Sequence, residues 1–596
     1  MEAPTTASVS KWPYWVGSTL FASVLLIHLP DMFQGIDLTD YGFHLTNQAA
    51  AFPVPPAEPA FPMFFLSDFV GGLWLEIIGR PSLLWAKFGG LLIVGLCALI
   101  SYKTLTTYFD RRRTWLAVFA SSLMVTMNWF CYLIDYYTFP SLLICLLLYS
   151  LNRVLHAPPS SRPFLFYAFL LGFLAVALIL ARFTLVTIAL LPLILAAHHA
   201  FKPEHCTGFT LRRSLPYVGL GIISALLLSG FLYQVTGVLK PYMSTVISAL
   251  SDASTGTPSS AYGSNYGFGI LFLRWGWNQF QALGRFVFFA VVLFALARLR
   301  NKFRHKATDA LIAVLLLALL VLLLSQLGPR EAGRAIISVI PIISLVFMFL
   351  VLRSCKSAKP GLSILFLAGV ILLFMSPIGS DTGLVKSLYG MWIPLPFMML
   401  IIWDLKSGAE GGWLEQIVST GRLLLWPLIL VALSIQFANV YRDSPNRLLL
   451  NTGFTDPGLR GIYSTEARSK AVDEALKEIK LRTSSNDVIL TVNSIPMFYY
   501  LTETRPLFGT PWPCNSCSEL ELAVNYERVC AQGLYPKLII CAKTDTQSRD
   551  WPNDRFTRWG DLSKVEYLMS KYVRELGYQL VWENNLCALY VPPGKR

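Results

Sequence analysis

Long apolar runs recur along the first 440 residues of the chain, separated by shorter polar stretches. Most runs are close to 20 residues, the length that a helix needs to cross the hydrocarbon core of a bilayer. We therefore expect about thirteen membrane-spanning helices. They lie near residues 14–30, 83–102, 114–134, 137–154, 164–181, 183–200, 215–236, 282–299, 309–327, 336–352, 361–377, 388–403 and 422–440.

The pattern changes after about Tyr441, where polar and charged residues become frequent and Pro and Gly interrupt the chain. The stretch "TEARSKAVDEALKEIK" has the apolar spacing of a helix, and "DVILTV" and "KLIICA" are typical of buried strands. "DLSKVEYLMSKYVRELG" predicts a second helix, and "YQLVWENNLCALYV" predicts a terminal hairpin turning at Asn584 and Asn585. We therefore expect a multi-pass α-helical membrane domain over residues 1–440 and a small α/β domain over 441–596.

Composition and charge agree with a membrane protein and indicate its orientation. Apolar residues make up 54% of the chain, charged residues only 14%, and the mean hydropathy is +0.53. The formal charge of +14 comes largely from short connections on one side of the predicted spans, such as 103–113, 298–306 and 353–359. By the positive-inside rule that side is cytoplasmic, together with the N-terminus, and the C-terminal domain is extracytoplasmic. Such loop anchors do not form the continuous basic groove of a nucleic-acid-binding protein.

Two further expectations concern the first apolar run and two cysteines of this protein of the cell membrane. The first apolar run has no small-residue cleavage site, so we expect it to remain as a span. Cys514 and Cys517 in "PCNSC" would lie in an oxidising compartment, which favours a disulfide or a structural clip over redox catalysis.

The stretch "GIDLTDYGFHLTN", directly after the first span, holds Asp37, Asp40 and His44. On a helix, spacings of three and four residues would place all three side chains on one face. A solvated loop that merely ends a membrane span is the simpler alternative. The choice between a site and a loop therefore depends on what the other outer span ends carry.

Other ionisable residues gather at the same predicted side. Asp135 lies in the turn between the third and fourth spans, and Arg182 in the next outer turn. Later outer segments add Arg274 in the loop 237–280, then Arg330, Arg334 and Asp381. Each alone could be an interfacial anchor or part of an ordinary turn. Together they predict a site for an anionic lipid head, because Arg binds phosphate oxygens and a carboxylate can accept the proton of an attacking hydroxyl.

With these residues in place, the layout resembles the integral-membrane GT-C glycosyltransferases, and most closely the protein O-mannosyltransferase and lipid A aminoarabinose transferase branch. The resemblance rests on "IDLTDYG" after the first span, the Asp at the third-to-fourth turn, about thirteen spans and an outer α/β domain. It implies a polyprenyl-phosphate-linked sugar as donor, transfer on the extracytoplasmic face, and inversion at the anomeric carbon. It also implies that Asp37 or Asp40, with Asp37 slightly favoured, is the base and that Asp135 is a second-loop acid. His44, Arg182, Arg274, Arg330, Arg334 and Asp381 would then contact substrates.

The chain departs from the family in two ways. Its two carboxylates are spaced Asp-x-x-Asp and are not an adjacent pair, which leaves both Asp37 and Asp40 open as the base. It also lacks the "WWDxG" sequence of oligosaccharyltransferases, which argues against transfer of a whole oligosaccharide to protein. The sugar remains open, and so does the acceptor, which could be a glycan, a lipid or a protein.

Two questions stay open at this stage. Asp37, Asp40 and His44 could together bind a divalent metal ion. The alternative function is a transporter or flippase of lipid-linked sugars, although transporters usually keep their ionisable groups near the bilayer midplane and in repeated halves.

Overall fold

The computed structural model describes most of the chain. The described residues are 15–51, 64–126, 132–158, 161–182, 185, 211–255, 268–302, 333–348, 361–377, 383–404, 427–438, 440–444, 446–548, 550–552 and 562–594, with isolated positions between 308 and 318. Apart from residue 185, the predicted span 183–200 lies outside these residues.

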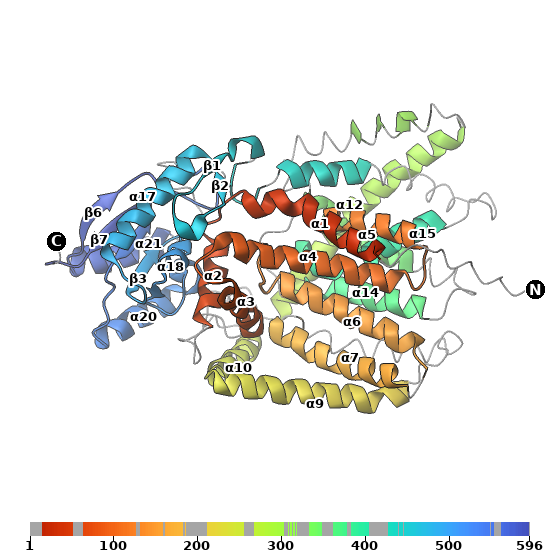
Figure 1. Ribbon diagram of the computed structural model, residues 1–596, viewed down its shortest axis with the longest axis horizontal. Coiled ribbons are helices and arrows are strands. Elements are labelled where there is room, and N and C mark those ends of the chain that lie inside the picture. Colours follow the sequence, from red (N-terminus) through yellow and green to blue (C-terminus); the bar gives the residue numbers. More distant parts are fainter. Residues whose placement is uncertain are drawn as a thin grey trace, which may run out of the picture.

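The described part is a multi-pass helical membrane protein with a C-terminal domain at one end of its helix bundle (Figure 1). Five helices in it are long and apolar enough to cross a membrane. They are α1 (Val16–Phe33), α4 (Leu83–Leu105), α6 (Thr138–His156), α7 (Arg162–Ala181) and α9 (Leu211–Val235).

A sixth span forms if two short helices are counted as one. These are η4 (Gly383–Gly390) and α15 (Pro394–Asp404), which meet at an angle of 78°. The prolines of "WIPLPF" explain the break, because a proline lacks the backbone N–H that a continuing helix would need. Shorter apolar helices are Gly333–Met348, α14 (Leu362–Met375) and Pro427–Ala438.

Small residues let neighbouring helices approach closely. A Cβ atom added to Gly172 of α7 would lie 2.0 Å from the carbonyl oxygen of Val218, and one added to Gly221 of α9 would lie 2.0 Å from that of Phe169. Such close backbone contact is a common way for helices to associate in lipid, where the hydrophobic effect does not drive them together. The opposite face of α9 exposes Leu227 and Phe231, as expected of a surface that faces lipid.

Two segments expected to be outer loops contain helices. The first holds α2 (Asp40–Ala50) and α3 (Phe65–Ile78), and the second holds α10 (Leu239–Thr255) and the start of α12 (Phe268–Lys302). The helices α2, α3 and α10 are not among the helices that could cross a membrane, so they belong to the connections between spans, and the sequence pattern did not predict that these connections are helical. They lie at the end of the bundle nearest the C-terminal domain (Figure 1). The helix α5 (Arg111–Thr126) is followed by a non-helical turn at 132–137, which contains Asp135 as predicted.

The C-terminal domain is built on a five-stranded sheet with the order β4-β3-β5-β7-β6. The strands β4 (Arg505–Pro506), β3 (Val488–Val492) and β5 (Ile539–Ala542) run parallel, and β7 (Cys587–Val591) is antiparallel to both β5 and β6 (Gln579–Glu583). The main helices are α17 (Glu466–Arg482), α18 (Met497–Thr502), α20 (Glu519–Ala531) and α21 (Leu562–Met569), the last continued by η7 (Ser570–Glu575).

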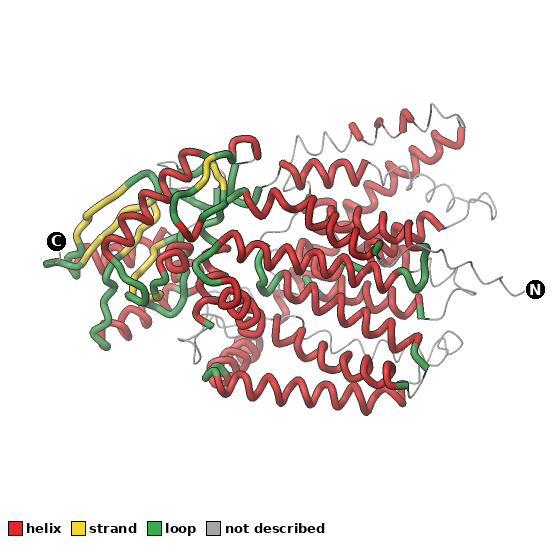
Figure 2. The backbone as a smooth tube through the Cα atoms, viewed as in Figure 1, coloured by secondary structure: helices red, strands yellow, loops and turns green. Residues whose placement is uncertain are grey.

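Among the described residues, all strands lie in this C-terminal part (Figure 2). A separate pair, β1 (Thr452–Gly453) and β2 (Tyr463–Ser464), lies beside the five-stranded sheet. Short elements complete the domain: η5 (Arg447–Leu449), η6 (Pro457–Leu459) and α19 (Pro513–Ser516). The structure thus confirms the predicted strands, the two helices and the terminal hairpin.

The disulfide that the sequence favoured is not formed, because Cys514 and Cys517 are both reduced. Cys514 lies in the first turn of α19 and Cys517 directly follows that helix, and both are buried in the apolar core between the sheet and the helices α20 and α21. Burial raises the pKa of the Cys517 thiol to about 12, which keeps it protonated and unreactive. Both cysteines therefore act as small apolar core residues.

The C-terminal domain packs directly on the first helix after the first span. The short helix α18 contacts α2, and the backbone N–H of Met497 donates to the carbonyl of Leu38 at 3.0 Å. Gly42 lies under this contact: a Cβ atom there would be 2.1 Å from the backbone nitrogen of Met497. The lack of a side chain at Gly42 is therefore what allows the two parts to touch.

We expect Gly42→Ala to weaken this contact despite the better helix propensity of alanine. Overpacking against a backbone costs about 1–3 kcal/mol, which exceeds the gain of about 1 kcal/mol from replacing glycine in a helix. Thermal unfolding of the detergent-solubilised protein should show a lower midpoint for Gly42→Ala. The matched control is Gly219→Ala on α9, where an added Cβ meets no atom within 4 Å. If Gly42→Ala were as stable as Gly219→Ala, α18 would not pack on α2 as described.

Candidate functional site

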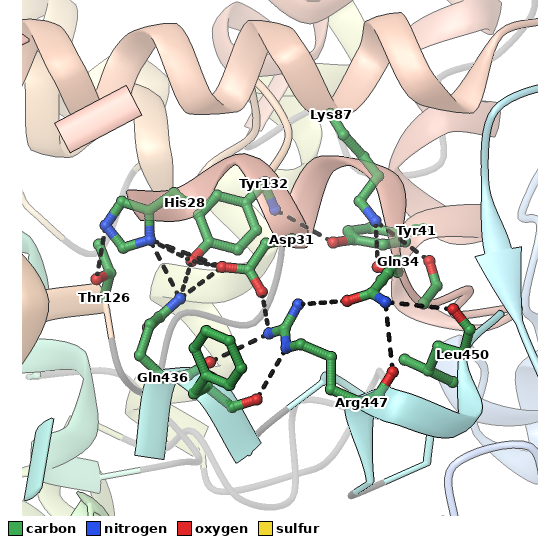
Figure 3. A network of polar contacts seen from close by, with 12 residues as sticks. His28, Asp31, Gln34, Tyr41, Lys87, Thr126, Tyr132, Gln436, Arg447 and Leu450 are labelled. Atoms are coloured by element: carbon green, nitrogen blue, oxygen red, sulfur yellow. Dashed lines mark hydrogen bonds and ion pairs between the residues drawn. The ribbon is translucent and has the colours of Figure 1, made fainter. Parts of the chain in front are cut away.

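Buried polar contacts fix the segment that leaves the first span. Lys87 of α4 is 1% exposed, and its Nζ donates to the carbonyl oxygens of Gln34 at 2.9 Å and Gly35 at 3.1 Å. Arg447 donates to the side-chain oxygen of Gln34 at 3.1 Å, so this segment is held from both the membrane bundle and the C-terminal part. Figure 3 shows these contacts together.

A second group of contacts joins α1 to the C-terminal part. Arg447 forms an ion pair with Asp31 of α1 at 2.5 Å. The other oxygen of Asp31 accepts from Gln436 at 2.5 Å and from the Tyr132 hydroxyl at 3.2 Å, and Gln436 also contacts His28 at 3.1 Å (Figure 3). Because Tyr132 begins the turn 132–137, this network places Asp135 relative to the first span.

Asp37 is fully buried and occupied by structural contacts. Its Oδ1 accepts from the backbone N–H and the hydroxyl of Thr39, and its Oδ2 accepts from the N–H of Tyr41 at 3.0 Å. These bonds satisfy donors at the start of α2 that have no partner within the helix. Arg442 also lies 3.3 Å from Asp37. Asp37 thus precedes the helix, and the expected single helical face with Asp40 and His44 is not formed.

Asp40 is the first residue of α2, and its side chain is 27% exposed. The Tyr441 hydroxyl donates to Oδ2, and the Arg442 guanidinium lies 3.1 Å from the same oxygen. Burial by itself would raise the pKa of Asp40, but Arg442, Tyr441 and the more distant Lys386 together lower it below its ordinary value. Asp40 is therefore an accessible carboxylate that stays ionised at neutral pH.

His44 lies next to Asp135 and forms no hydrogen bond with Asp40. Its Nε2 is 3.8 Å from Oδ2 of Asp135. His44 lies one helical turn after Asp40. The Asp40 carboxylate binds Tyr441 and Arg442, and the imidazole of His44 faces the 132–137 turn. Burial lowers the pKa of His44, and the nearby Asp135 and Asp40 only partly oppose this effect. His44 is therefore neutral at pH 7.

One carboxylate oxygen of Asp135 accepts hydrogen bonds, and the other, Oδ2, has no hydrogen-bond partner among the described residues. Its Oδ1 accepts the backbone N–H groups of Tyr137 and Thr138, both at 2.8 Å. Burial raises the pKa of Asp135, although His44 and the two backbone N–H groups partly offset the rise. Asp68 of α3 is also buried, and burial together with the charge of Asp135 raises the pKa of Asp68 well above its ordinary value.

Arg182 and Lys386 supply positive charge next to these acids. Arg182 follows α7 and is 4% exposed; its guanidinium donates to the Tyr389 hydroxyl at 3.3 Å and lies 5.0 Å from the centre of that ring. Lys386 of η4 is 3% exposed, with Nζ 3.7 Å from the centre of the Tyr137 ring. Lys386 is close enough to lower the pKa of Asp135, against the larger effect of burial. We call Arg182, Lys386, Tyr137 and Tyr389 the cationic group.

The remaining predicted site residues do not all join this cluster. Arg274 is exposed on α12, so the structure does not place it among the buried acids. Arg334 is half-buried in the first turn of helix Gly333–Met348. Arg330 and Asp381 lie outside the described residues.

Sequence reasoning missed Lys386 and Arg442, and it did not single out Asp68. Lys386 carried a signal, because a lysine within "GLVKSLYGMWIPLPF" is an ionisable residue in an apolar segment, and such residues usually serve function. Arg442 lies two residues after the last predicted span, at the predicted domain boundary. Its role depends on contacts across 400 residues of sequence, which no local pattern indicates.

The residues present do not fit a metal site. In the described part of the chain, no group of three or more His, Cys, Asp or Glu side chains lies close enough together to hold a metal ion. Asp37 binds the start of α2 and Arg442, Asp40 binds Tyr441 and Arg442, and His44 faces Asp135, so other side chains already engage each of the three residues. We therefore derive no chemistry from a metal.

Comparison with known proteins gives only distant likenesses. No protein-family model and no curated protein sequence matches the chain. Among solved structures, ArnT from Cupriavidus metallidurans bound to undecaprenyl phosphate aligns over 97% of this chain and 98% of its own, with 12% identity and a TM-score of 0.43. The oligosaccharyltransferase of Archaeoglobus fulgidus in complex with Zn and sulfate aligns over 88% and 68%, with 12% identity and a TM-score of 0.46.

A third structure is the archaeal oligosaccharyltransferase AglB from Archaeoglobus fulgidus in complex with an inhibitory peptide and a dolichol-phosphate. It covers 89% of this chain and 69% of its own, with 11% identity and a TM-score of 0.44. Because every one of these TM-scores is below 0.5, the functional argument rests on the residues of this chain.

Proposed function

We propose that the chain is a glycosyltransferase that moves a sugar from a polyprenyl-phosphate-linked donor to an acceptor hydroxyl on the extracytoplasmic face of the membrane. The observation that carries this proposal is an accessible carboxylate, Asp40, that lies near enough to the buried Lys386 of the cationic group for the charge of Lys386 to lower the pKa of Asp40. The positive-inside distribution of basic loops places this end of the bundle outside the cytoplasm.

The cationic group suits a lipid phosphate. Arg182 and Lys386 lie at the bundle end, where a polyprenyl tail can remain in lipid while its phosphate reaches protein. A guanidinium and an ammonium can both donate to phosphate oxygens, and their burial among tyrosine rings strengthens this attraction because little water screens it.

Asp40 suits the role of general base. It accepts the proton of the acceptor hydroxyl as the oxygen attacks the anomeric carbon, and the bond between that carbon and the phosphate oxygen breaks. The polyprenyl phosphate then leaves with its negative charge stabilised by Arg182 and Lys386. Attack opposite to the leaving phosphate inverts the anomeric configuration.

Asp37 suits a different role from Asp40. It pairs with Arg442 while its oxygens hold the start of α2, so Arg442 keeps one carboxylate partner when Asp40 becomes protonated during the reaction. This division of work favours Asp40 over Asp37 as the base, in contrast to the slight preference drawn from the family resemblance.

A transporter remains the alternative, but no observation favours it. The ionisable residues gather at the end of the bundle against the C-terminal domain, whereas a transport site usually lies near the bilayer midplane. A test of transfer chemistry therefore also separates these two functions.

Asp40→Asn tests the role of Asp40 as the general base. Asp40→Asn should insert and unfold like the wild type yet lose about 10²–10⁴-fold in kcat, the usual cost of removing a general base. Asp37→Asn, the matched control, should lower the midpoint of thermal unfolding and reduce kcat less than tenfold per folded molecule. The measurement is transfer of sugar from a polyprenyl-phosphate donor by the purified protein. Full turnover by Asp40→Asn would remove Asp40 from the reaction.

The pH dependence of kcat tests which group acts as the base. The base must be ionised, so kcat falls as the pH drops through the pKa of Asp40, which is lowered mainly by Arg442 against burial. Arg442→Gln removes that charge, burial then dominates, and the pKa of Asp40 rises. The acid limb of the kcat profile should therefore move to higher pH in Arg442→Gln and less far in Arg442→Lys. An acid limb that stays in place in both variants would show that a different group titrates.

Variants of Arg182 and Lys386 test whether these residues bind the donor phosphate. Arg182→Gln and Lys386→Gln should each raise the KM for donor about 10- to 150-fold, which corresponds to a charge-assisted hydrogen bond of roughly 1.5–3 kcal/mol. Arg153→Gln is the control, because Arg153 also lies over a tyrosine ring, that of Tyr167, but at the other end of α6. Unchanged donor kinetics in both test variants would place the phosphate elsewhere.

A further inference from the structure

Three buried polar side chains in the site have atoms without a hydrogen-bond partner in the described part of the chain. They are Nδ1 of His44, Oδ1 of Asp68 and Oδ2 of Asp135. The three residues are 2%, 6% and 0% exposed. A buried polar atom without a partner has lost its hydrogen bonds to water without replacing them, so three such atoms in one place require an explanation.

The three side chains come from different elements and lie close together. His44 of α2 is 3.8 Å from Asp135 of the 132–137 turn. Asp68 lies one helical turn before Gly71 on α3, and therefore on the same face. A Cβ atom at Gly71 would lie 2.5 Å from the carbonyl oxygen of Ile134, so this face of α3 packs on the turn that carries Asp135.

An aromatic surface borders the three residues. The ring of Tyr136 lies 4.7 Å from that of His44, and its centre is 4.3 Å from that of Phe64, with the two rings stacked. The guanidinium of Arg182 lies 5.7 Å from the same Tyr136 ring. The unpartnered atoms are therefore adjacent to the cationic group.

We propose that His44, Asp68 and Asp135 form a subsite that binds hydroxyl groups of an uncharged donor sugar, with Tyr136 at the border of the subsite. This proposal rests on the proposed function and adds the class of sugar to it. An uncharged carboxyl group and a neutral imidazole can each donate one hydrogen bond and accept another. A sugar hydroxyl has the same capacity, so the unpartnered atoms and the ligand satisfy one another.

The surroundings favour hydroxyl groups over a cation. Burial raises the pKa values of Asp68 and Asp135, which favours their uncharged forms. An amino sugar with a positive charge would need an ionised carboxylate, but Asp37 and Asp40 already pair with Arg442. The described residues also lack the close group of three ligands that a metal ion would require.

The test compares lipids with and without a sugar, using the full chain in detergent. The probes are polyprenyl phosphate esters of glucose, galactose, mannose, arabinose and an amino sugar, with polyprenyl methyl phosphate as a sugar-free diester of the same charge. At least one uncharged sugar ester should bind about tenfold more tightly than the methyl ester, and more tightly than the amino-sugar ester. This corresponds to one or two hydrogen bonds to sugar hydroxyls.

Variants of Asp68 show which property of the side chain matters. Asp68→Leu should remove the about tenfold preference for the sugar ester while leaving the affinity for the methyl ester unchanged. Asp68→Asn can still donate and accept, so it should retain the preference within about threefold. Glu76→Gln is the control on the same helix, because Glu76 is exposed and pairs with Arg80.

Other binding results would contradict either the sugar subsite or the proposed function. If the methyl ester binds but no sugar strengthens binding, the subsite is refuted and the phosphate site stands. If none of the lipids binds, the proposed function itself fails. If Asp68→Asn loses as much as Asp68→Leu, or if the amino-sugar ester or an added divalent ion binds best, the acids act as ionised ligands and the proposal is wrong.

Discussion

A buried charge must be paired, and in this protein the partners of the buried aspartates come from the far end of the chain. Asp31 of the first span pairs with Arg447, and Asp37 and Asp40 pair with Arg442. An isolated buried carboxylate would cost several kcal/mol, so neither the helix bundle nor the C-terminal domain can hold this arrangement alone. The geometry of the site therefore depends on the contact between the two parts.

The same contact separates the roles of two carboxylates that are only three residues apart. Helix α2 begins at Asp40, so Asp37 turns inward to bind the helix start and Asp40 stays at the rim. Asp443 holds this start from the other side: it accepts from the backbone N–H of Ile36 at 2.9 Å and forms an ion pair with buried Arg468.

The sequence predicts the parts of the protein that local physical rules determine. Apolar runs of bilayer length identify the main spans, and alternating helix and strand patterns identify the α/β domain because each depends only on neighbouring residues. Asp135 and Arg182 could be named because charges at the ends of apolar runs are conspicuous. The order of the two Asp roles could not be predicted, since it depends on where α2 begins.

Other features of the site depend on contacts that are distant along the chain. Arg442 becomes part of the site only because the C-terminal domain folds back onto α2. Asp68 enters it because the connection between α1 and α4 folds into the helix α3, which lies across the bundle end. The buried thiols of Cys514 and Cys517 show the converse, since a spacing that suggests a covalent link is used for packing.

The long separation between the paired charges has a consequence for synthesis and membrane insertion. Asp31 leaves the ribosome about 400 residues before Arg447, so for most of translation this carboxylate has no guanidinium partner. The first span must therefore wait in a hydrated or protonated state until the last helix and the junction have been inserted.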